Sequence, residues 1–184
     1  MTTPSLNRIR VWDLPTRLFH WSLAASFFIA FFTAESERWR DVHVISGYTV
    51  GGLLAFRLLW GFVGNRHARF AEFWPTPEKL LRYLKSLFGR HPEHYLGHNP
   101  AGAVAILLLL GLGLLTVASG WLTYEEIGGE LFEEVHETLG DGMMALVVIH
   151  IAGVIASSRL HGENLVRAMI SGWKRCPPDE NSAG

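Results

Sequence analysis

Cysteine is almost missing from this chain of 184 residues, which has only Cys176. A disulfide within the chain is therefore excluded, and there is no CxxCH motif of the kind that attaches haem covalently. The chain has no excess of positive or negative charge, with 16 Lys and Arg and 17 Asp and Glu. This balance disfavours a nucleic-acid partner. The first residues, MTTPSLNRIRVWD, lack the apolar core of a signal peptide. We therefore expect any membrane insertion to use uncleaved segments.

What the chain does have is long apolar runs. Hydrophobic residues make up 49% of the sequence and charged residues 18%. Four runs approach the length of about 20 residues that a bilayer requires; they cover residues 18–34, 44–63, 101–122 and 135–157. The third is the most apolar, whereas the first and fourth are marginal. The sequence predicts an all-α membrane protein, a four-transmembrane-helix bundle forming one domain over residues 1–184, with a loop at 64–100 and a tail at 158–184.

The basic residues gather on one side of these runs. Three precede the first run, six lie in the loop at 64–100, and four follow the fourth, which leaves only Arg38, Arg40 and Arg57 elsewhere. Cytoplasmic loops carry an excess of Lys and Arg. Both termini are therefore expected in the cytoplasm. The two loops on the opposite side are acidic, with carboxylates at Glu35, Glu37, Asp41, Glu125, Glu126, Glu130, Glu133 and Glu134.

The loop at 64–100 contains an amphipathic segment, TPEKLLRYLKSLFG. Thr76 suits an N-cap, Pro77 the first helical position and Gly89 the end of a helix. The pattern predicts a helix that lies in the cytoplasmic interface of the membrane or packs on the ends of the spans. The tail segment ENLVRAMISGWKR predicts a shorter helix of the same kind. The apolar face holds Leu80, Leu81, Leu84, Leu87 and Phe88, and the other face holds Lys79, Arg82 and Lys85.

Nine histidines are present, and their depth in the runs separates them. Four lie within or at the ends of spans, where an ionisable group is costly and indicates function: His20, His43, His136 and His150. His136 and His150 are fourteen residues apart, so they share a helix face and are separated by about 21 Å. Depth pairs His20 with His150 on the cytoplasmic side and His43 with His136 on the other. His98 lies where the third run begins, and the remaining four are expected to be ordinary loop or tail residues: His67, His91, His94 and His161.

Two imidazoles that face each other between helices form an axial ligand set for a haem iron, and bundle cores hold such cofactors. Haem bound only in this way is b-type, so the spacing predicts two haems b. Alternatives are a hydrogen-bonded structural role, a zinc site, which requires three or four ligands in one cluster, and a proton relay, for which Asp141 is the only acid within a run. Small neighbours leave room for the macrocycle or serve helix packing: Ala24, Gly47, Gly51, Gly140 and Gly153.

Arg57 is the other costly group within a run. It follows His43 by fourteen residues, which places it near the depth of the cytoplasmic-side pair on a similar helix face. Its guanidinium is predicted either to pair with a haem propionate or to extend to the interface.

Several segments together resemble the bacterial cytochrome b561 family, which includes the b-type cytochrome subunits of nickel–iron hydrogenases. They are VWDLPTRLFHW, HVISGYTVGGLLAFRLLWGFVG, GHNPAG, HETLG, HIAGV and HGENLVRAMISGWKR. The resemblance covers about residues 8–175 and implies a cytoplasmic-membrane location in a bacterium. The family's haem histidines match His20, His43, His136 and His150. A looser likeness to the membrane subunit of formate dehydrogenase implies a quinone site at His98, Asn99 and Gly102.

Three functions remain open from the sequence. The first is a di-haem electron carrier between the quinone pool and a redox partner, namely cytochrome c or a hydrogenase or dehydrogenase subunit. The second is a stand-alone quinone oxidoreductase that uses a small reductant such as superoxide, as some relatives do, although the acidic loops would repel an anion. The third is a membrane anchor subunit of a hydrogenase or dehydrogenase complex, without haem. Membrane lipid is a further expected partner in every case.

Overall fold

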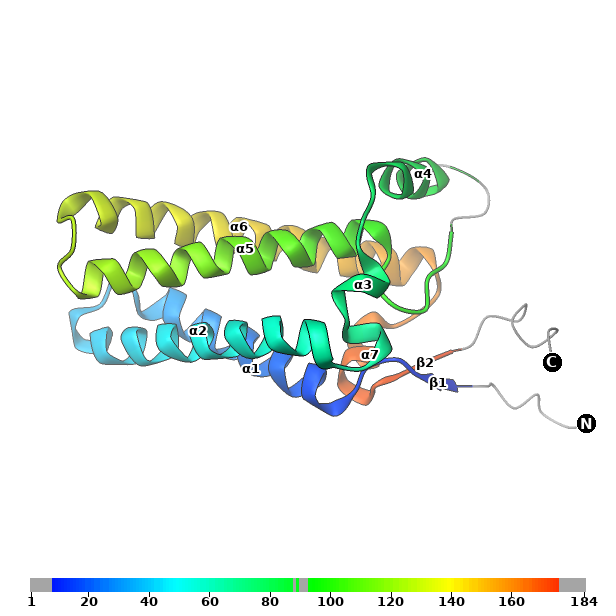
Figure 1. The fold of residues 1–184 in the computed structure, drawn as a ribbon, viewed down its shortest axis with the longest axis horizontal. Helices are drawn as coiled ribbons and strands as arrows, with labels where there is room; N and C mark the ends of the chain where they lie inside the picture. The colour runs from blue at the N-terminus through cyan, green and yellow to red at the C-terminus, as the bar shows by residue number, and fades with distance from the viewer. Residues whose placement is uncertain (1–7, 88, 90–92, 176–184) are drawn as a thin grey trace, which may run out of the picture.

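Four long helices lie side by side in the computed structural model, which describes residues 8–87, 89 and 93–175 (Figure 1). Phe88, His91 and Cys176 lie outside the described residues. The long helices are α1 (Leu14–Thr33), α2 (Arg40–Val63), α5 (Pro100–Tyr124) and α6 (Glu130–Leu160). The shorter elements are β1 (Arg8–Arg10), η1 (Glu37–Trp39), η2 (Arg66–Ala68), α3 (Phe70–Phe73), α4 (Pro77–Leu87), α7 (Leu165–Ser171) and β2 (Trp173–Arg175).

Side chains before two of the long helices explain where these helices begin. The carboxylate of Asp13 accepts a hydrogen bond from the Thr16 backbone N–H (2.8 Å), and Pro15 follows in the first turn of α1. The side chain of Asn99 likewise accepts from the Gly102 N–H (2.7 Å), with Pro100 as the first residue of α5. An N-cap of this type satisfies a free backbone donor, and proline is preorganised for the first turn. Helix α1 therefore starts before the apolar run at 18–34.

Three of the described helical segments are long and apolar enough to cross a membrane: Glu37–Val63, Pro100–Tyr124 and Glu130–Leu160. Helix α1 is not among them, because Arg17 and His20 lower the hydropathy of its first half. Most side chains of the three segments are not buried within the chain. Apolar side chains on the outside of long helices are expected where lipid, and not water, surrounds them.

The helices form two hairpins. Helix α1 packs along α2, α5 packs along α6, and α2 contacts α5, whereas α6 does not pack closely on α1 or α2 within the described ranges. The core of the bundle lies where α2 meets α5, around Val50, Leu54 and Leu110, of which Leu54 is 1% exposed. One side of α6 therefore lacks the close helix packing that joins α1 to α2 and α5 to α6 within the described ranges.

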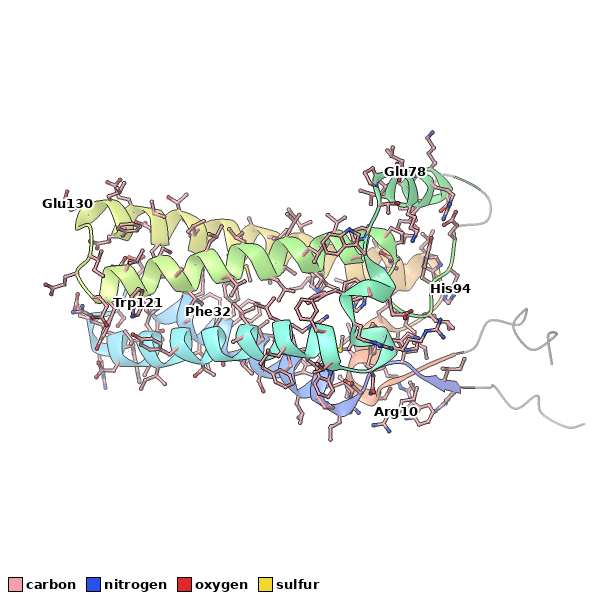
Figure 2. All side chains as sticks on the ribbon, viewed as in Figure 1. Arg10, Phe32, Glu78, His94, Trp121 and Glu130 are labelled. Carbon is pink, nitrogen blue, oxygen red and sulfur yellow. The ribbon has the colours of Figure 1, made fainter. Side chains whose placement is uncertain are left out.

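The two ends of the bundle differ. We call the end with the α1–α2 and α5–α6 connections the hairpin end, and the opposite end, where β1 and β2 lie, the terminal end (Figure 1). Figure 2 shows Glu130 at the hairpin end, and Arg10 and His94 at the terminal end. Strands β1 and β2 pair antiparallel, with Arg8 opposite Arg175, so the first and last described segments are joined.

Helix α7 is the short tail helix expected from the sequence, but it stops earlier than the segment 163–175 suggested. Gly172 has a φ of +87° and ends the helix, and the chain continues as β2. A Cβ at this position would lie 2.7 Å from the Trp12 backbone oxygen, so only glycine fits here. Val11, Trp12 and Ala168 form a small core at this turn.

Helix α4 follows Thr76, whose hydroxyl accepts a hydrogen bond from the Lys79 N–H (3.3 Å). It lies beside one end of α5 with its axis across the long axis of the bundle (Figure 1). Tyr83 is buried, whereas Leu81 and Leu84 are 57% and 39% exposed. The helix thus has a face toward the protein and an apolar face that the described chain leaves uncovered.

Candidate functional site

His43 on α2 and His136 on α6 face each other near the hairpin end. Their ring centres are 6.0 Å apart and their planes are inclined by 83°. Two imidazoles on opposite sides of one metal ion, each at a metal–nitrogen distance of about 2 Å, have ring centres about 6 Å apart. The two side chains therefore fit axial coordination of a single iron.

The hydrogen bonds of these rings define which nitrogen is free. His43 Nδ1 lies 2.8 Å from the Ala30 carbonyl oxygen, and His136 Nδ1 lies 2.9 Å from that of Thr116. A carbonyl oxygen can only accept, so each Nδ1 carries the proton and donates. In both rings Nε2 then has a lone pair, which is the form that binds metal. The sequence alone could not show this, because the partners are main-chain atoms.

His20 on α1 and His150 on α6 are the second pair that the sequence predicts, toward the terminal end. The His20 ring also lies against Trp21, with ring centres 5.0 Å apart. Its Nδ1 is buried without a hydrogen-bond partner among the described residues. His20 therefore has a buried nitrogen that no described residue satisfies, as expected where a further group binds nearby.

The small residues beside the histidines differ in their surroundings. A Cβ at Gly47, Gly140 or Gly153 would meet no described atom within 4 Å. These three glycines leave space next to candidate ligands, as a flat macrocycle requires. Gly51 differs, because a Cβ there would lie 2.9 Å from a methyl group of Val117. It serves the close approach of α2 and α5.

Arg57 is buried in spite of its charge, with 4% of the side chain exposed. Its guanidinium lies over the Phe70 ring at 4.9 Å, and the negative charge of Asp13 favours its charged form. Nη1 has no hydrogen-bond partner within the described part of the chain. The side chain therefore does not extend to water, and one of its donors is available for a bound anion.

His98 lies in an apolar environment, with ring centres 4.6 Å from Trp12 and 4.5 Å from Phe73. Burial, together with the positive charges of Arg57 and Lys174, lowers the pKa of this imidazole to about 3. His98 is thus neutral at physiological pH, and its Nδ1 has no partner among the residues described. The other two residues of the predicted quinone site have a local role, because the Asn99 side chain caps α5 at Gly102.

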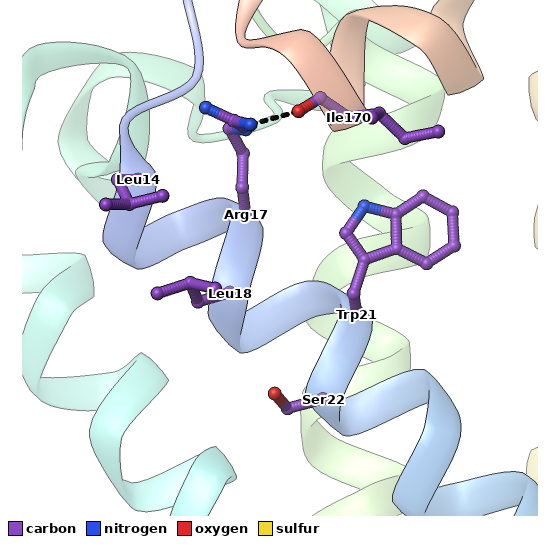
Figure 3. Close-up of a pocket in the computed structure, with 6 residues that line it drawn as sticks. All are labelled: Leu14, Arg17, Leu18, Trp21, Ser22 and Ile170. Atoms are coloured by element: carbon purple, nitrogen blue, oxygen red, sulfur yellow. Dashed lines mark hydrogen bonds between the residues drawn. The ribbon is translucent and has the colours of Figure 1, made fainter.

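The remaining predicted loop and tail histidines lie apart from these pairs. His94 and His161 contact each other at 5.3 Å between ring centres, and His94 Nε2 lies 3.3 Å from Glu163. A cavity of about 480 Å³ reaches His67 and Asp13. An open groove of about 370 Å³ runs between α1 and α7, where Arg17 donates to the Ile170 carbonyl oxygen (Figure 3). Neither cavity is lined by the four paired histidines.

Paired histidines between long apolar helices define a class, the membrane-bound b-type cytochromes. The chain belongs to the prokaryotic cytochrome b561 family, whose model matches residues 11–172. It is accordingly a membrane protein that transfers electrons through haem b, as the resemblance of its motifs implied.

Relatives in three bacteria carry the same name, "Probable Ni/Fe-hydrogenase B-type cytochrome subunit". The chain is 25% identical to the protein of Bradyrhizobium diazoefficiens, over 91% of this chain and 86% of the relative. It is 26% identical to that of Azotobacter vinelandii, over 93% and 90%, and to that of Rhodobacter capsulatus, over 93% and 83%. No solved structure matches the chain.

Proposed function

We propose that the chain is a di-haem cytochrome of the bacterial cytoplasmic membrane that carries electrons between a redox partner protein and quinone. His43 and His136 would hold one haem, and His20 and His150 would hold the other. Each haem would supply one-electron redox chemistry when bound. The chain sets the tautomers of His43 and His136 and separates the two pairs by about 21 Å along α6.

The geometry of His43 and His136 carries this proposal. The separation of 6.0 Å between their ring centres suits one iron, and both Nδ1 atoms are already occupied by carbonyl groups. A structural histidine pair would more simply hydrogen-bond ring to ring. The two rings instead have Nε2 free and are brought together from different hairpins.

Two further groups are assigned on the terminal side. Arg57 would donate from its unpartnered Nη1 to a haem propionate. His98 would offer its buried Nδ1, which has no partner among the described residues, to a quinone oxygen. Asn99 and Gly102 would then shape the site through the start of α5.

The redox partner is proposed to be a hydrogenase subunit, because the relatives that match most of the chain bear that name.

A stand-alone oxidoreductase that uses superoxide is the second candidate function. The carboxylates of the hairpin end are exposed, and they would repel an anionic reductant while attracting a basic protein such as a cytochrome c.

Four membrane crossings complete the proposal. Helix α1 runs beside α2 for its whole length, so it is proposed as the fourth span. Helix α4 is proposed to lie in the interface, with the exposed Leu81 and Leu84 toward lipid.

The test is haem content of the purified full-length chain, measured by reduced-minus-oxidised spectra and haem-to-protein ratio. We expect two haems b, and one in each of His43→Ala and His20→Ala. His67→Ala, a change at the loop, is the control and should retain both. A chain without a b-type spectrum would instead be a haem-free anchor, and unchanged haem content in both variants would refute the ligand assignment.

The identity of the electron donor is tested by measuring reduction of a quinone analogue by the purified chain. We expect turnover only when a hydrogenase is added, with hydrogen as the electron source. Turnover of the isolated chain with superoxide would favour the second candidate.

A further inference from the structure

Helix α5 has no histidine, yet it makes the closest polar contacts to His136. The Thr116 carbonyl oxygen lies 2.9 Å from His136 Nδ1, and the Ser119 hydroxyl lies 3.2 Å from the same atom. Ser119 is 4% exposed, although it is polar. The hydroxyl of Ser119 is thus buried beside the His136 ring.

The hydrogen bonds among Ser119, Thr116 and His136 show which atoms donate and which accept. The Ser119 hydroxyl donates to the Thr116 carbonyl oxygen at 3.0 Å. Its own proton is therefore used, and its lone pairs remain for the Nδ1–H of His136. The imidazole N–H thus has two acceptors, and Nε2 becomes more basic as a ligand.

Gly120 fixes the position of the same ring. A Cβ at this residue would lie 2.6 Å from His136 Cε1 and 3.0 Å from Nδ1. Contacts this short do not occur, so any side chain at 120 would push the ring away from α5. Gly111, on the same helix, has no described atom within 4 Å of such a Cβ.

Helix α1 supplies a single carbonyl acceptor to His43. The Ala30 carbonyl oxygen accepts from His43 Nδ1 at 2.8 Å, and the Thr33 hydroxyl donates to that oxygen at 3.2 Å and to the Ile29 oxygen at 2.7 Å. The terminal pair is different, because His20 Nδ1 has no partner in the described part of the chain. The two histidine pairs therefore differ in how strongly the protein supports their ligand nitrogens.

We propose that Ser119 and Gly120 are positioning residues that hold His136 as a basic Nε2 ligand and so lower the reduction potential of the haem at His43 and His136. This inference rests on the proposed haem at that pair. A more basic axial ligand donates more electron density and favours ferric iron over ferrous. The effect is local, so the haem at His20 and His150 keeps its potential.

Potentiometric titration of the purified full-length chain tests whether Gly120 holds the His136 ring in place. In Gly120→Ala the ring moves away from its acceptors, and we expect one of the two redox steps to shift to higher potential while the other stays. Gly111→Ala is the matched control on the same helix and should leave both steps unchanged.

The hydrogen-bonding part is tested with Ser119→Ala, which removes an oxygen and adds no volume. We expect the same redox step to rise, with a changed hyperfine coupling of the remote imidazole nitrogen in pulsed EPR spectra. Ser119→Thr keeps the γ-oxygen and should restore the wild-type values, which a role in packing alone would not predict.

Two results would overturn the inference: both steps unchanged in Gly120→Ala and Ser119→Ala, or haem loss in Gly120→Ala with Ser119→Ala unaltered. Failure of the proposed function is distinct, since it would appear as a wild-type chain without two haems or as haem retention in His43→Ala.

Discussion

The carboxylate of Asp13 connects three parts of the chain at the terminal end. It caps α1 at Thr16 and accepts from Trp60 Nε1 at 3.1 Å and from Asn65 Nδ2 at 2.9 Å. It is also the charge that offsets the buried Arg57. Nothing in the sequence around residue 13 predicted these distant partners, because they come from the end of α2 and the loop behind it.

Replacement of Asp13 by alanine should therefore be costly. The helix cap is lost and two donors are left unsatisfied, so we expect a loss of about 2–4 kcal/mol of stability. Thermal unfolding in detergent micelles measures it. Glu35→Ala, at an exposed carboxylate in the α1–α2 connection, is the control and should change little. An equal melting temperature for the two variants would contradict the role of Asp13.

The lowered pKa of His98 predicts that the stability of the folded chain depends on pH. Its pKa is lowered to about 3 in the folded chain, while an unfolded histidine titrates near 6.5. Between these values the unfolded chain binds a proton that the folded chain does not, so stability falls as the pH decreases below about 6.5.

Melting temperatures at pH 8 and pH 5 test this effect. The loss on acidification should be smaller in His98→Phe, whose ring suits the contacts with Trp12 and Phe73. Leu84→Ala, an exposed change without a titrating group, should retain the wild-type dependence. The same loss in wild type and His98→Phe would show that His98 does not contribute.

At the scale of elements, the helices could be predicted and the contacts between them could not. The third apolar run indicated α5 within two residues at each end, and Thr76 and Pro77 indicated the start of α4. Strands β1 and β2 lie more than 160 residues apart in sequence, and no local pattern marks their pairing. The support of His136 by α5 was missed for a related reason. Thr116, Ser119 and Gly120 resemble ordinary small residues of a packed helix.

Packing of α3 on α2 depends on a glycine and gives an element-scale prediction. A Cβ at Gly61 would lie 2.0 Å from the Phe70 ring, whereas one at Gly52, on the same helix, would meet no described atom within 4 Å. Gly61→Ala should cost about 1–3 kcal/mol through overpacking. Gly52→Ala should stabilise the helix by up to about 1 kcal/mol. Melting temperatures of both variants measure this difference, and its absence would mean that α3 moves freely to accommodate a methyl group.

At the scale of the whole molecule, the two ends of the bundle carry opposite charge. Exposed carboxylates gather at the hairpin end, where Figure 2 labels Glu130. Strands β1 and β2 and helix α4 bring basic residues to the terminal end, where Figure 2 labels Arg10. The candidate haem ligands lie between these ends, one pair nearer to each. If both pairs hold haem as proposed, the two redox groups would lie near opposite faces of the membrane.

The arrangement of the chain ends predicts the membrane topology. Pairing of β1 with β2 holds both described ends of the chain on one side of the bundle, so the number of crossings must be even. Because three helices already qualify as spans, we predict that α1 is the fourth. The basic terminal end is then predicted to face the cytoplasm. A fluorescent protein fused to the C-terminus should fluoresce, and alkaline phosphatase inserted at Gly128, in the α5–α6 connection, should be active. The opposite pattern, an inactive phosphatase at Gly128 and an active one at the C-terminus, would invert the assignment of both haem sites to the two faces of the membrane.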